Sequence, residues 1–320
     1  FVDSHVAEDD LTVGSYGLDQ CLDLTQAALV RGNGATAPDG PQWRVGEGMA
    51  VAMIATIPPR GHFSDASVSL DADGIYTLSV GTAEFGNGTS TVHVRLAAEA
   101  LGVSADRIRL RQSDTDVTAY DTGAFGSAGT VVAGLAVQSA CRELRQALES
   151  EAASGSMTRP LVGHGRHEGT PRSVAFNVHG FRVAVNTETG EVRILQSVQA
   201  ADAGVVMNPE QCRGQVEGGV AQAIGTALYE EMRVDGRGQV TTKDLRNYHI
   251  PQLADLPVTE VYFADTYDKL GPLGAKSMSE SPYNPVAPAL ANAIARACGA
   301  RMYRLPMTPA RVWRELHGPS

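Results

Sequence analysis

The sequence predicts an α+β fold in which helices accompany mixed sheets, and three observations favour it. Alternating apolar residues at 66–70 and 75–80 flank the turn Asp71-Ala-Asp-Gly74, a pattern typical of a β-hairpin. A second hairpin is expected at 182–196, around Glu188-Thr-Gly190. The second strand of the first hairpin, a helix and a further strand then follow one another as in a βαβ unit.

Each element of the first half follows from its local pattern. Helices are expected where apolar residues recur with helical spacing, and strands where they alternate. Gly102 ends the second helix as a C-cap residue should. The expected elements are a helix at 17–29, strands at 44–56, 66–70 and 75–80, a helix at 89–101, a strand at 107–112 and a helix at 130–154.

The second half begins after a polar stretch with Gly and Pro at 153–171, which predicts a linker. We therefore expect two subdomains, over residues 1–155 and 156–320. Pro209 suits the first turn of a helix because its φ is fixed, and Thr308 is an expected N-cap. After the second hairpin, the expected elements are a helix at 209–232, a strand at 258–264 and helices at 288–298 and 309–317.

Composition indicates a globular chain that binds neither nucleic acid nor membranes. Hydrophobic residues make up 43% and charged residues 19%. The net charge of −10 argues against a phosphate-binding surface, and no apolar run approaches the roughly 20 residues of a membrane span. The opening Phe1-Val-Asp-Ser-His lacks the basic and apolar regions of a signal peptide, and no initiator methionine precedes it. We expect a processed product or a fragment.

The cysteines and histidines predict no metal site. No C-x-x-C spacing occurs, so the four separated cysteines are expected to be reduced core residues and the protein to be cytoplasmic. His164 and His167 fall in an expected Gly-rich loop, where metal ligation is not favoured. Neither a G-x-x-x-x-G-K-[ST] loop nor a strand-linked G-x-G-x-x-G occurs, which argues against nucleoside triphosphate or NAD sites of those types. The cysteines are Cys21, Cys141, Cys212 and Cys298.

Three segments built from small residues, 84–89, 123–130 and 214–219, lie at the start of a predicted helix or within one. Glycines let the backbone approach a ligand, N–H groups at a helix start attract negative oxygens, and amide side chains bond to polar ring edges. The segments together suit a flat, anionic ligand. Taken singly, each segment is better explained by turns, helix caps or, at Gly214, Gly218 and Gly219, close helix packing.

One carboxylate, Glu280, lies in the loop Gly274-Ala-Lys-Ser-Met-Ser-Glu-Ser-Pro282. Apolar neighbours are expected to raise its pKa, which would make it a usable base near neutral pH. A solvated or helix-capping glutamate is the alternative. The expected neighbours are Met278, Pro282, Tyr283 and Val286.

These motifs, in this order, resemble those of the molybdenum hydroxylases, the xanthine dehydrogenase and aldehyde oxidoreductase family. The Glu280 loop is similar to the family signature G-x-K-G-x-G-E, and 81–88 is similar to G-T-E-x-G-Q-G. The resemblance runs from about 45 to 305 and implies the C-terminal half of a molybdopterin-binding large subunit with an aldehyde-oxidoreductase-like fold. Further similar segments are Asp73-Gly74, 97–102, Asp114-Thr115, Asn208-Pro209, Gly214-Gln-Val-Glu-Gly218 and Tyr248-His-Ile-Pro251.

By motif position, the resemblance implies that Glu280 is the catalytic base in the hydroxylation of an electron-poor carbon with oxygen from water. The small-residue segment 84–89 would face the molybdenum, and the segment 123–130 would contact the cofactor. Gln215 would form a hydrogen bond with the pterin. The cofactor itself would hold the metal, so no metal-ligating side chain is expected. The implied cofactor-binding residues are Phe85, Gly86, Asn87, Gly88, Gly126, Ser127, Ala128 and Gln215.

Four positions depart from the family pattern or have an open role. Asn87 replaces a glutamine and shortens the amide's reach by about 1.5 Å. Ser277 and Ser279 replace glycines next to Glu280, which removes backbone freedom. Lys276 is expected to support the loop, to pair with an acid or to be solvated.

The family's other cofactor loop, its iron–sulfur cysteines and a flavin domain have no counterpart in the sequence. The resemblance therefore implies partners: a chain with the N-terminal half of the molybdopterin subunit, an iron–sulfur subunit with 2Fe-2S clusters and an FAD subunit. The expected cofactor is molybdopterin in its cytosine dinucleotide form, with molybdenum.

The expected substrate is a small purine-like or pyridine-like N-heterocycle, with an aldehyde as the alternative. A rival hypothesis is a scaffold that binds the cofactor without turnover. A hydrolase with Ser127 or Ser279 as nucleophile is disfavoured because no G-x-S-x-G elbow occurs.

Overall fold

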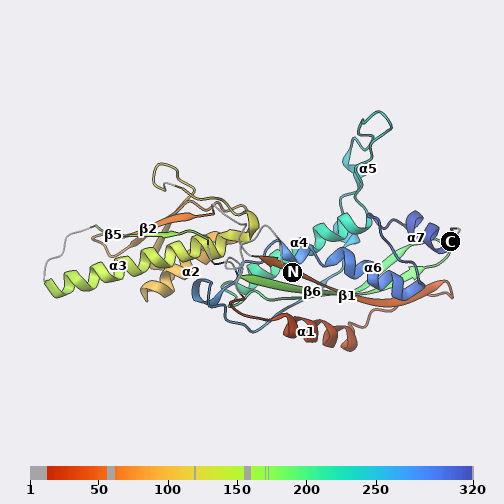
Figure 1. Cartoon of the computed structure of the whole chain (residues 1–320), viewed down its shortest axis with the longest axis horizontal. Coiled ribbons are helices and arrows are strands. Elements are labelled where there is room, and N and C mark those ends of the chain that lie inside the picture. The colour runs from red at the N-terminus through yellow and green to blue at the C-terminus, as the bar shows by residue number, and fades with distance from the viewer. Residues whose placement is uncertain are drawn as a thin grey trace.

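The strands form two separate four-stranded sheets, each with its own helices, side by side along the long axis of the computed structural model (Figure 1). The structure describes residues 13–55, 62–118, 120–154, 160–169, 171 and 173–318. The strands are β1 (Trp43–Ala55), β2 (Ser64–Leu70), β3 (Tyr76–Val80), β4 (Ile108–Gln112), β5 (Leu161–His167), β6 (Val174–Asn186), β7 (Val192–Ala201) and β8 (Thr259–Phe263). The helices are α1 (Leu18–Arg31), α2 (Thr89–Leu101), α3 (Gly134–Ser154), α4 (Pro209–Leu228), α5 (Leu245–Tyr248), α6 (Val286–Cys298) and α7 (Pro309–His317).

The first sheet has the order β1-β6-β7-β8, with antiparallel pairs except for the parallel pair β7–β8. Its centre is the hairpin predicted at 182–196, which extends further in both strands. Helix α6 packs on β1 and β6, and α1 packs on β6 and β7. Two glycines of β1, Gly46 and Gly48, lie directly under α6, where an added Cβ would collide with the helix backbone. The small residues thus allow the helix to lie close to the sheet.

The second sheet has the order β4-β3-β2-β5 and is also mixed, because β3 and β4 run parallel. Strand β3, helix α2 and strand β4 form the expected βαβ unit, and α2 has the bounds that the sequence predicts. Helices α2 and α3 pack together and bury the core of this sheet. Both sheets confirm the predicted α+β class.

Strand β5 corrects the prediction of a linker at 153–171. It pairs with β2 over its whole length and carries His164 and His167, which were expected in a loop. An added Cβ at Gly163 or Gly165 would collide with carbonyl groups of α3. These glycines therefore serve close helix packing on a strand, although in sequence they resemble a loop. The rest of the predicted linker includes 155–159 and 170, which lie outside the described residues.

The two sheets do not follow the division at residue 155. Strand β1 joins the sheet of the second half, and β5 joins the sheet of the first half. The hydrophobic cores are separate: one lies between the first sheet and helices α4, α6 and α7, and the other lies under α2 and α3. Each sheet with its helices, here called a body, is thus built from both halves of the chain.

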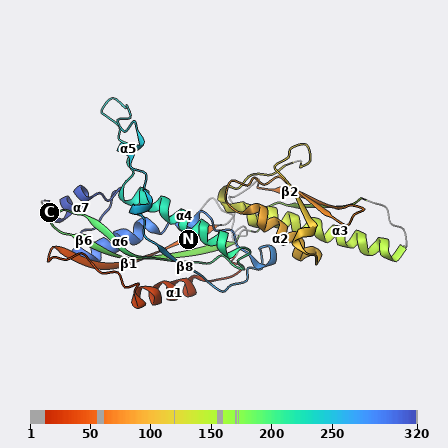
Figure 2. The ribbon, with the colours of Figure 1, turned by 180° about the vertical axis from the view of Figure 1, so that it is seen from behind.

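Two helices have an end that differs from the prediction, and a third lacks its expected capping bond. Helix α4 ends at Leu228 rather than near Met232, and the chain then leaves the body as the projection that contains α5 (Figures 1 and 2). A π-helical turn, Gly129–Ala133, precedes α3 where a regular helix was expected. Thr308 occupies the N-cap of α7, but its side chain makes no capping bond. Within the described residues, no helix is both long and apolar enough to cross a membrane.

Candidate functional site

The junction of the two bodies contains a cavity of about 400 Å³. Its walls come from the loop before α2, the loop before α3, helix α4 and the loop before α6. Five of the nine residues predicted for the site meet here: Phe85, Asn87, Ser127, Gln215 and Glu280. The complete lining is Phe85, Asn87, Thr89, Ala124, Ser127, Gly129, Thr130, Gln215, Ser279 and Glu280.

The other four predicted residues lie next to this cavity in the chain without lining it. Gly86 and Gly126 have positive φ angles of 98° and 64°, which glycine adopts without strain. Gly88 is the N-cap of α2 and also has a positive φ. Ala128 is buried. Their role in the structure is to shape the loops.

Glu280 is bonded to Ser127 in both directions. The Ser127 hydroxyl donates to Glu280 Oε2 at 3.0 Å and accepts from the backbone N–H of Glu280 at 3.1 Å. The carboxylate is otherwise exposed to solvent. Met278 and Val286 pack in the core instead of around it, so the apolar surroundings expected for Glu280 are absent in the described structure. Ser127 was expected to contact the cofactor, and in the structure its hydroxyl orients the Glu280 carboxylate.

Ser127 is held in an unusual backbone conformation, with a φ of 58°. For a residue other than glycine this left-handed region carries strain, which persists where the surroundings impose it. Two contacts fix the turn that follows. Ser277 Oγ accepts from the N–H of Val131 at 3.1 Å, and His93 Nε2 donates to the carbonyl of Gly129 at 3.1 Å. Burial lowers the pKa of His93 and keeps the ring neutral.

The Glu280 loop is anchored from beneath by the first sheet. Gln199 of β7 donates to the carbonyl of Pro282 at 3.2 Å, and Asn177 of β6 donates to the hydroxyl of Ser281. All three of these side-chain groups are buried. The sheet therefore fixes the backbone on the C-terminal side of Glu280, while Ser127 fixes its side chain.

The N-terminal side of the same loop is fixed by a buried charge cluster. Lys276 Nζ lies 2.6 Å from Asp202 Oδ2 and 3.8 Å from Asp268 Oδ2, with all three side chains fully buried. The ammonium group also donates to the carbonyls of Ser15 and Val174. Of the alternatives for Lys276, pairing with an acid is correct. The pair ties the loop to Asp202, which begins the segment before α4.

The loop before α2 is organised by Glu84, which sequence reasoning missed. Its Oε1 accepts from the N–H groups of Gly86 and Gly88 at 2.7 and 3.0 Å, and its Oε2 accepts from the N–H of Ser90 at 3.0 Å. Burial alone would raise the pKa of Glu84, but these backbone donors together lower it. The N–H groups expected to attract an anionic ligand are thus already occupied by a carboxylate.

Two amide side chains complete the polar lining. Asn87 Oδ1 accepts from the hydroxyl of Thr89 at 3.2 Å, so this oxygen helps to begin α2. Gln215 Nε2 donates to the carbonyl of Gly86 at 3.3 Å, which leaves its oxygen facing the cavity region. The glycines beside it, Gly214 and Gly218, were explained by close packing as an alternative, but an added Cβ would meet nothing within 4 Å. This side of α4 is open.

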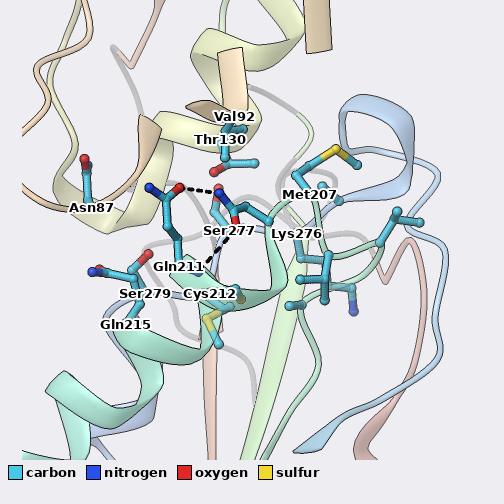
Figure 3. Close-up of a pocket in the computed structure, with 16 residues that line it drawn as sticks. Asn87, Val92, Thr130, Met207, Gln211, Cys212, Gln215, Lys276, Ser277 and Ser279 are labelled. Atoms are coloured by element: carbon cyan, nitrogen blue, oxygen red, sulfur yellow. Dashed lines mark hydrogen bonds between the residues drawn. The ribbon is translucent and has the colours of Figure 1, made fainter. Parts of the chain in front are cut away.

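A smaller cavity of about 60 Å³ continues the site beneath Gln215. It shares Asn87, Thr130, Gln215 and Ser279 with the larger one. Figure 3 shows Gln211 and Gln215 on α4 facing side chains that belong to the body built on the second sheet. Within the described residues, no group of three or more His, Cys, Asp or Glu side chains could hold a metal ion. An anchored carboxylate and converging amides in an open cavity suit a polar ligand.

The cysteines play no part in this arrangement beyond packing. All four are free; Cys21 and Cys141 are buried, whereas Cys212 and Cys298 are half-buried. Burial raises the pKa of Cys21 and Cys141 to about 12. The same cause raises the pKa of Cys212, which lines the smaller cavity, to about 12. Thiols of this kind are unreactive near neutral pH.

Sequence matches give this geometry a context. Residues 20–160 and 153–257 match the family described as molybdopterin cofactor-binding domain. The chain is 30% identical over 311 residues to the probable hypoxanthine oxidase XdhD of Escherichia coli, covering 86% of this chain and 32% of that protein. It is 31% identical over 299 residues to the aldehyde oxidoreductase molybdenum-binding subunit PaoC of Escherichia coli, covering 83% of this chain and 40% of that one.

A solved structure gives the same picture of the fold. The aldehyde oxidoreductase from Desulfovibrio desulfuricans superposes with a TM-score of 0.78 at 26% identity, covering 93% of this chain and 35% of that chain. The chain thus spans well under half the length of each of these relatives.

Proposed function

The chain belongs to the molybdopterin cofactor-binding domain family, and from this premise we propose that it is the C-terminal half of the molybdopterin-binding subunit of a molybdenum hydroxylase. The observation that carries the proposal is the convergence of Glu280, Ser127, Asn87 and Gln215 on one cavity. These side chains come from four loops or helices that are distant in sequence. A merely structural glutamate would not require this convergence.

We assign to Glu280 the role of general base. Its carboxylate is exposed to the cavity and held by the Ser127 hydroxyl, while the backbone on both sides is anchored. The base would take a proton from the water-derived oxygen that attacks the substrate carbon. A positioned base of this kind contributes about 10²–10⁴ in rate.

The lining fits the expected cofactor. The walls offer the side chains of Asn87, Ser127 and Gln215. Next to the cavity, α4 has an open face at Gly214 and Gly218, where an added Cβ would meet nothing within 4 Å. When bound, the molybdenum cofactor would supply the site that accepts the electrons of the oxidation. Gln215 would bond to the pterin edge, and Phe85 would cover the reacting region. The cytosine dinucleotide form of the cofactor is part of the proposal.

Glu84 limits where negative groups of the cofactor can bind. Its carboxylate already accepts from the N–H groups at the start of α2, so a phosphate at that position would meet a like charge. Backbone amides of the 126–128 loop are the remaining candidates. We also propose that both bodies, and hence both 1–155 and 156–320, contribute to the binding surface.

For the substrate, we propose a purine-like or pyridine-like N-heterocycle. The similarity to a probable hypoxanthine oxidase supports this choice. An aldehyde is the second candidate because an aldehyde oxidoreductase subunit is equally similar. The same base serves both reactions, since each adds water-derived oxygen to an electron-poor carbon.

The proposal includes partners and a cytoplasmic location. Because the chain spans 32% of one relative and 40% of another, a second polypeptide segment with the N-terminal half should complete the cavity. Iron–sulfur and FAD subunits would carry electrons away from the site.

The test compares the assembled enzyme with the isolated chain. We expect the complex to contain molybdenum and to reduce a dye with purines, nicotinate or aldehydes, and the isolated chain to bind little metal and show no turnover. A complex that contains molybdenum but reduces no dye with any of these substrates would indicate a scaffold. Stoichiometric molybdenum in the isolated chain would contradict the shared cavity.

A further inference from the structure

An ordered projection with apolar side chains on its outside follows α4. Residues 229–258, here called the α5 arm, leave the body in both views (Figures 1 and 2). Leu245 is 70% exposed, Leu253 90% and Val258 86%. Further exposed apolar side chains of the arm are Met232, Val234, Val240 and Ile250. Isolated exposed apolar residues are common, but a cluster of this size on one projection indicates a binding surface.

Polar contacts within the arm hold it in a defined shape. Asp235 accepts from the N–H groups of Arg237 and Gln239 and closes the tip. Asp244 caps α5 through the N–H of Asn247. The ring of His249 stacks on Tyr229, with ring centroids 4.9 Å apart. Tyr229 and Leu256, at the two ends of the arm, pack against the core. The exposed apolar side chains between and beside them are not needed for the shape of the arm, which leaves them for another polypeptide.

The foot of the arm forms an apolar groove of about 440 Å³ against α4. Leu253 and Val258 form one side, and Val220 and Ile224 of α4 lie at its base. The whole lining is Glu217, Val220, Ala221, Ile224, Leu253, Leu256, Pro257, Val258 and Thr259.

The groove and the Glu280 cavity lie on opposite flanks of α4. Gln215, which lines the cavity, and Ile224, which lines the groove, are about two and a half helical turns apart. The exposed ridge between them carries Gly214 and Gly218, where nothing lies within 4 Å of an added Cβ. A single polypeptide could therefore lie across α4, fill the groove on one side and close the cavity on the other.

We propose that this groove and the α5 arm form the docking surface for the polypeptide segment that supplies the rest of the molybdopterin-binding subunit. The inference rests on the proposed function, because that function requires such a segment. The relatives are about two to three times as long as the aligned region, so the proposed segment would be at least as large as this chain and would need a sizeable contact surface on it. The groove fits it because it is apolar and preformed, and because only the open ridge of α4 at Gly214 and Gly218 separates it from the Glu280 cavity.

Substitutions at exposed positions test this surface without disturbing the fold. Leu253→Asp and Val258→Asp should each lower the amount of the N-terminal-half segment that copurifies with the tagged chain by about tenfold or more. Val30→Asp is the matched control, because Val30 is 79% exposed on α1, on the other face of the first sheet. Thermal unfolding should be nearly unchanged in all three variants. Unaltered copurification in both groove variants would overturn the proposal.

Photo-crosslinking in the assembled enzyme identifies the occupant. A crosslinking residue placed at position 253 should join a peptide related to the part of the relatives that this chain does not cover. A crosslink to a second copy of this chain, to an iron–sulfur chain or to a flavin chain would overturn the assignment. The molybdenum content and dye reduction of the unsubstituted complex, measured in parallel, test the proposed function separately. An active, metal-containing complex with a different crosslink would contradict only the docking surface.

Discussion

The hydroxyl of Ser127 and the carboxylate of Glu280 are 153 positions apart in the chain and are joined by two hydrogen bonds, one to the side chain and one to the backbone N–H. One serine thus fixes both the position and the orientation of the proposed base. Since Ser127 adopts a left-handed backbone conformation with a φ of 58°, the fold bears strain at this contact.

Removing the hydroxyl tests this contact. Ser127→Ala keeps the same backbone strain and deletes both bonds, so the proposed base should lose its fixed orientation. We expect kcat of the assembled enzyme to fall about tenfold, with KM changed little, because an interaction with a charged group is lost. Steady-state kinetics measures both constants. A kcat within about twofold of the natural enzyme would show that the contact is not needed for turnover.

The base itself is tested by Glu280→Gln, which preserves size and the ability to accept from Ser127. Turnover should fall at least about 10²-fold because the amide cannot take up the proton. Molybdenum content and thermal unfolding should stay unchanged. Glu188→Gln, at an exposed hairpin turn, is the matched control. Near-normal turnover in Glu280→Gln would exclude the assigned role.

Lys276 should be essential for stability. Lys276→Met leaves the buried carboxylates of Asp202 and Asp268 without their cation. We expect a loss of about 3–5 kcal/mol in the free energy of unfolding, measured with urea. Lys269→Met, at an exposed position, should change little. The double variant Lys276→Met/Asp202→Asn should recover part of the loss. If the single variant is as stable as the control, the ion pair does not support the loop.

Glu84 should make stability depend on pH. Because its folded-state pKa is lowered, its contribution is fully present above the unfolded value of roughly 4.3 and is lost as the pH falls through the folded value. Glu84→Gln should remove this part of the acid dependence of the melting temperature. At neutral pH it should cost about 0.5–1 kcal/mol, as for loss of an exposed helix cap. Glu315→Gln, on the exposed side of α7, serves as the control. Parallel acid profiles for the natural protein and Glu84→Gln would contradict the role of Glu84.

Local patterns predicted most elements because helices and hairpins depend on near neighbours. Helix α2 has the predicted bounds, and the strand–helix–strand unit forms as expected. Strand β5 was missed because Gly163 and Gly165 make the segment resemble a flexible loop in sequence. In the structure, glycine is needed at these positions because α3 lies directly against the strand. This packing involves residues about 20 to 30 positions away in the chain, so it leaves no local signal in the sequence.

The candidate site was predicted at the level of loops but not of contacts. Sequence order placed Asn87, Ser127, Gln215 and Glu280 on the right segments, and the cavity joins them. The partners of Lys276 and Glu280 lie far off in the chain, so no pattern could name Asp202 or Ser127 for those roles. Glu84 offered one signal, an acidic residue just before a glycine turn and a helix start. The hydrogen bonds of Glu84 to the backbone still depend on the loop conformation, which the sequence alone does not give.

The exchange of strands β1 and β5 between the two bodies has a consequence for dissecting the protein. A cut near residue 157 would separate β5 from its neighbour β2 and β6 from its neighbour β1. Each fragment would then expose an unpaired strand edge. Neither fragment could then bury its helices as it does now, since Gly46, Gly48, Gly163 and Gly165 all lie on the strands that change sides. The two pieces should precipitate when made singly and become soluble only when produced together.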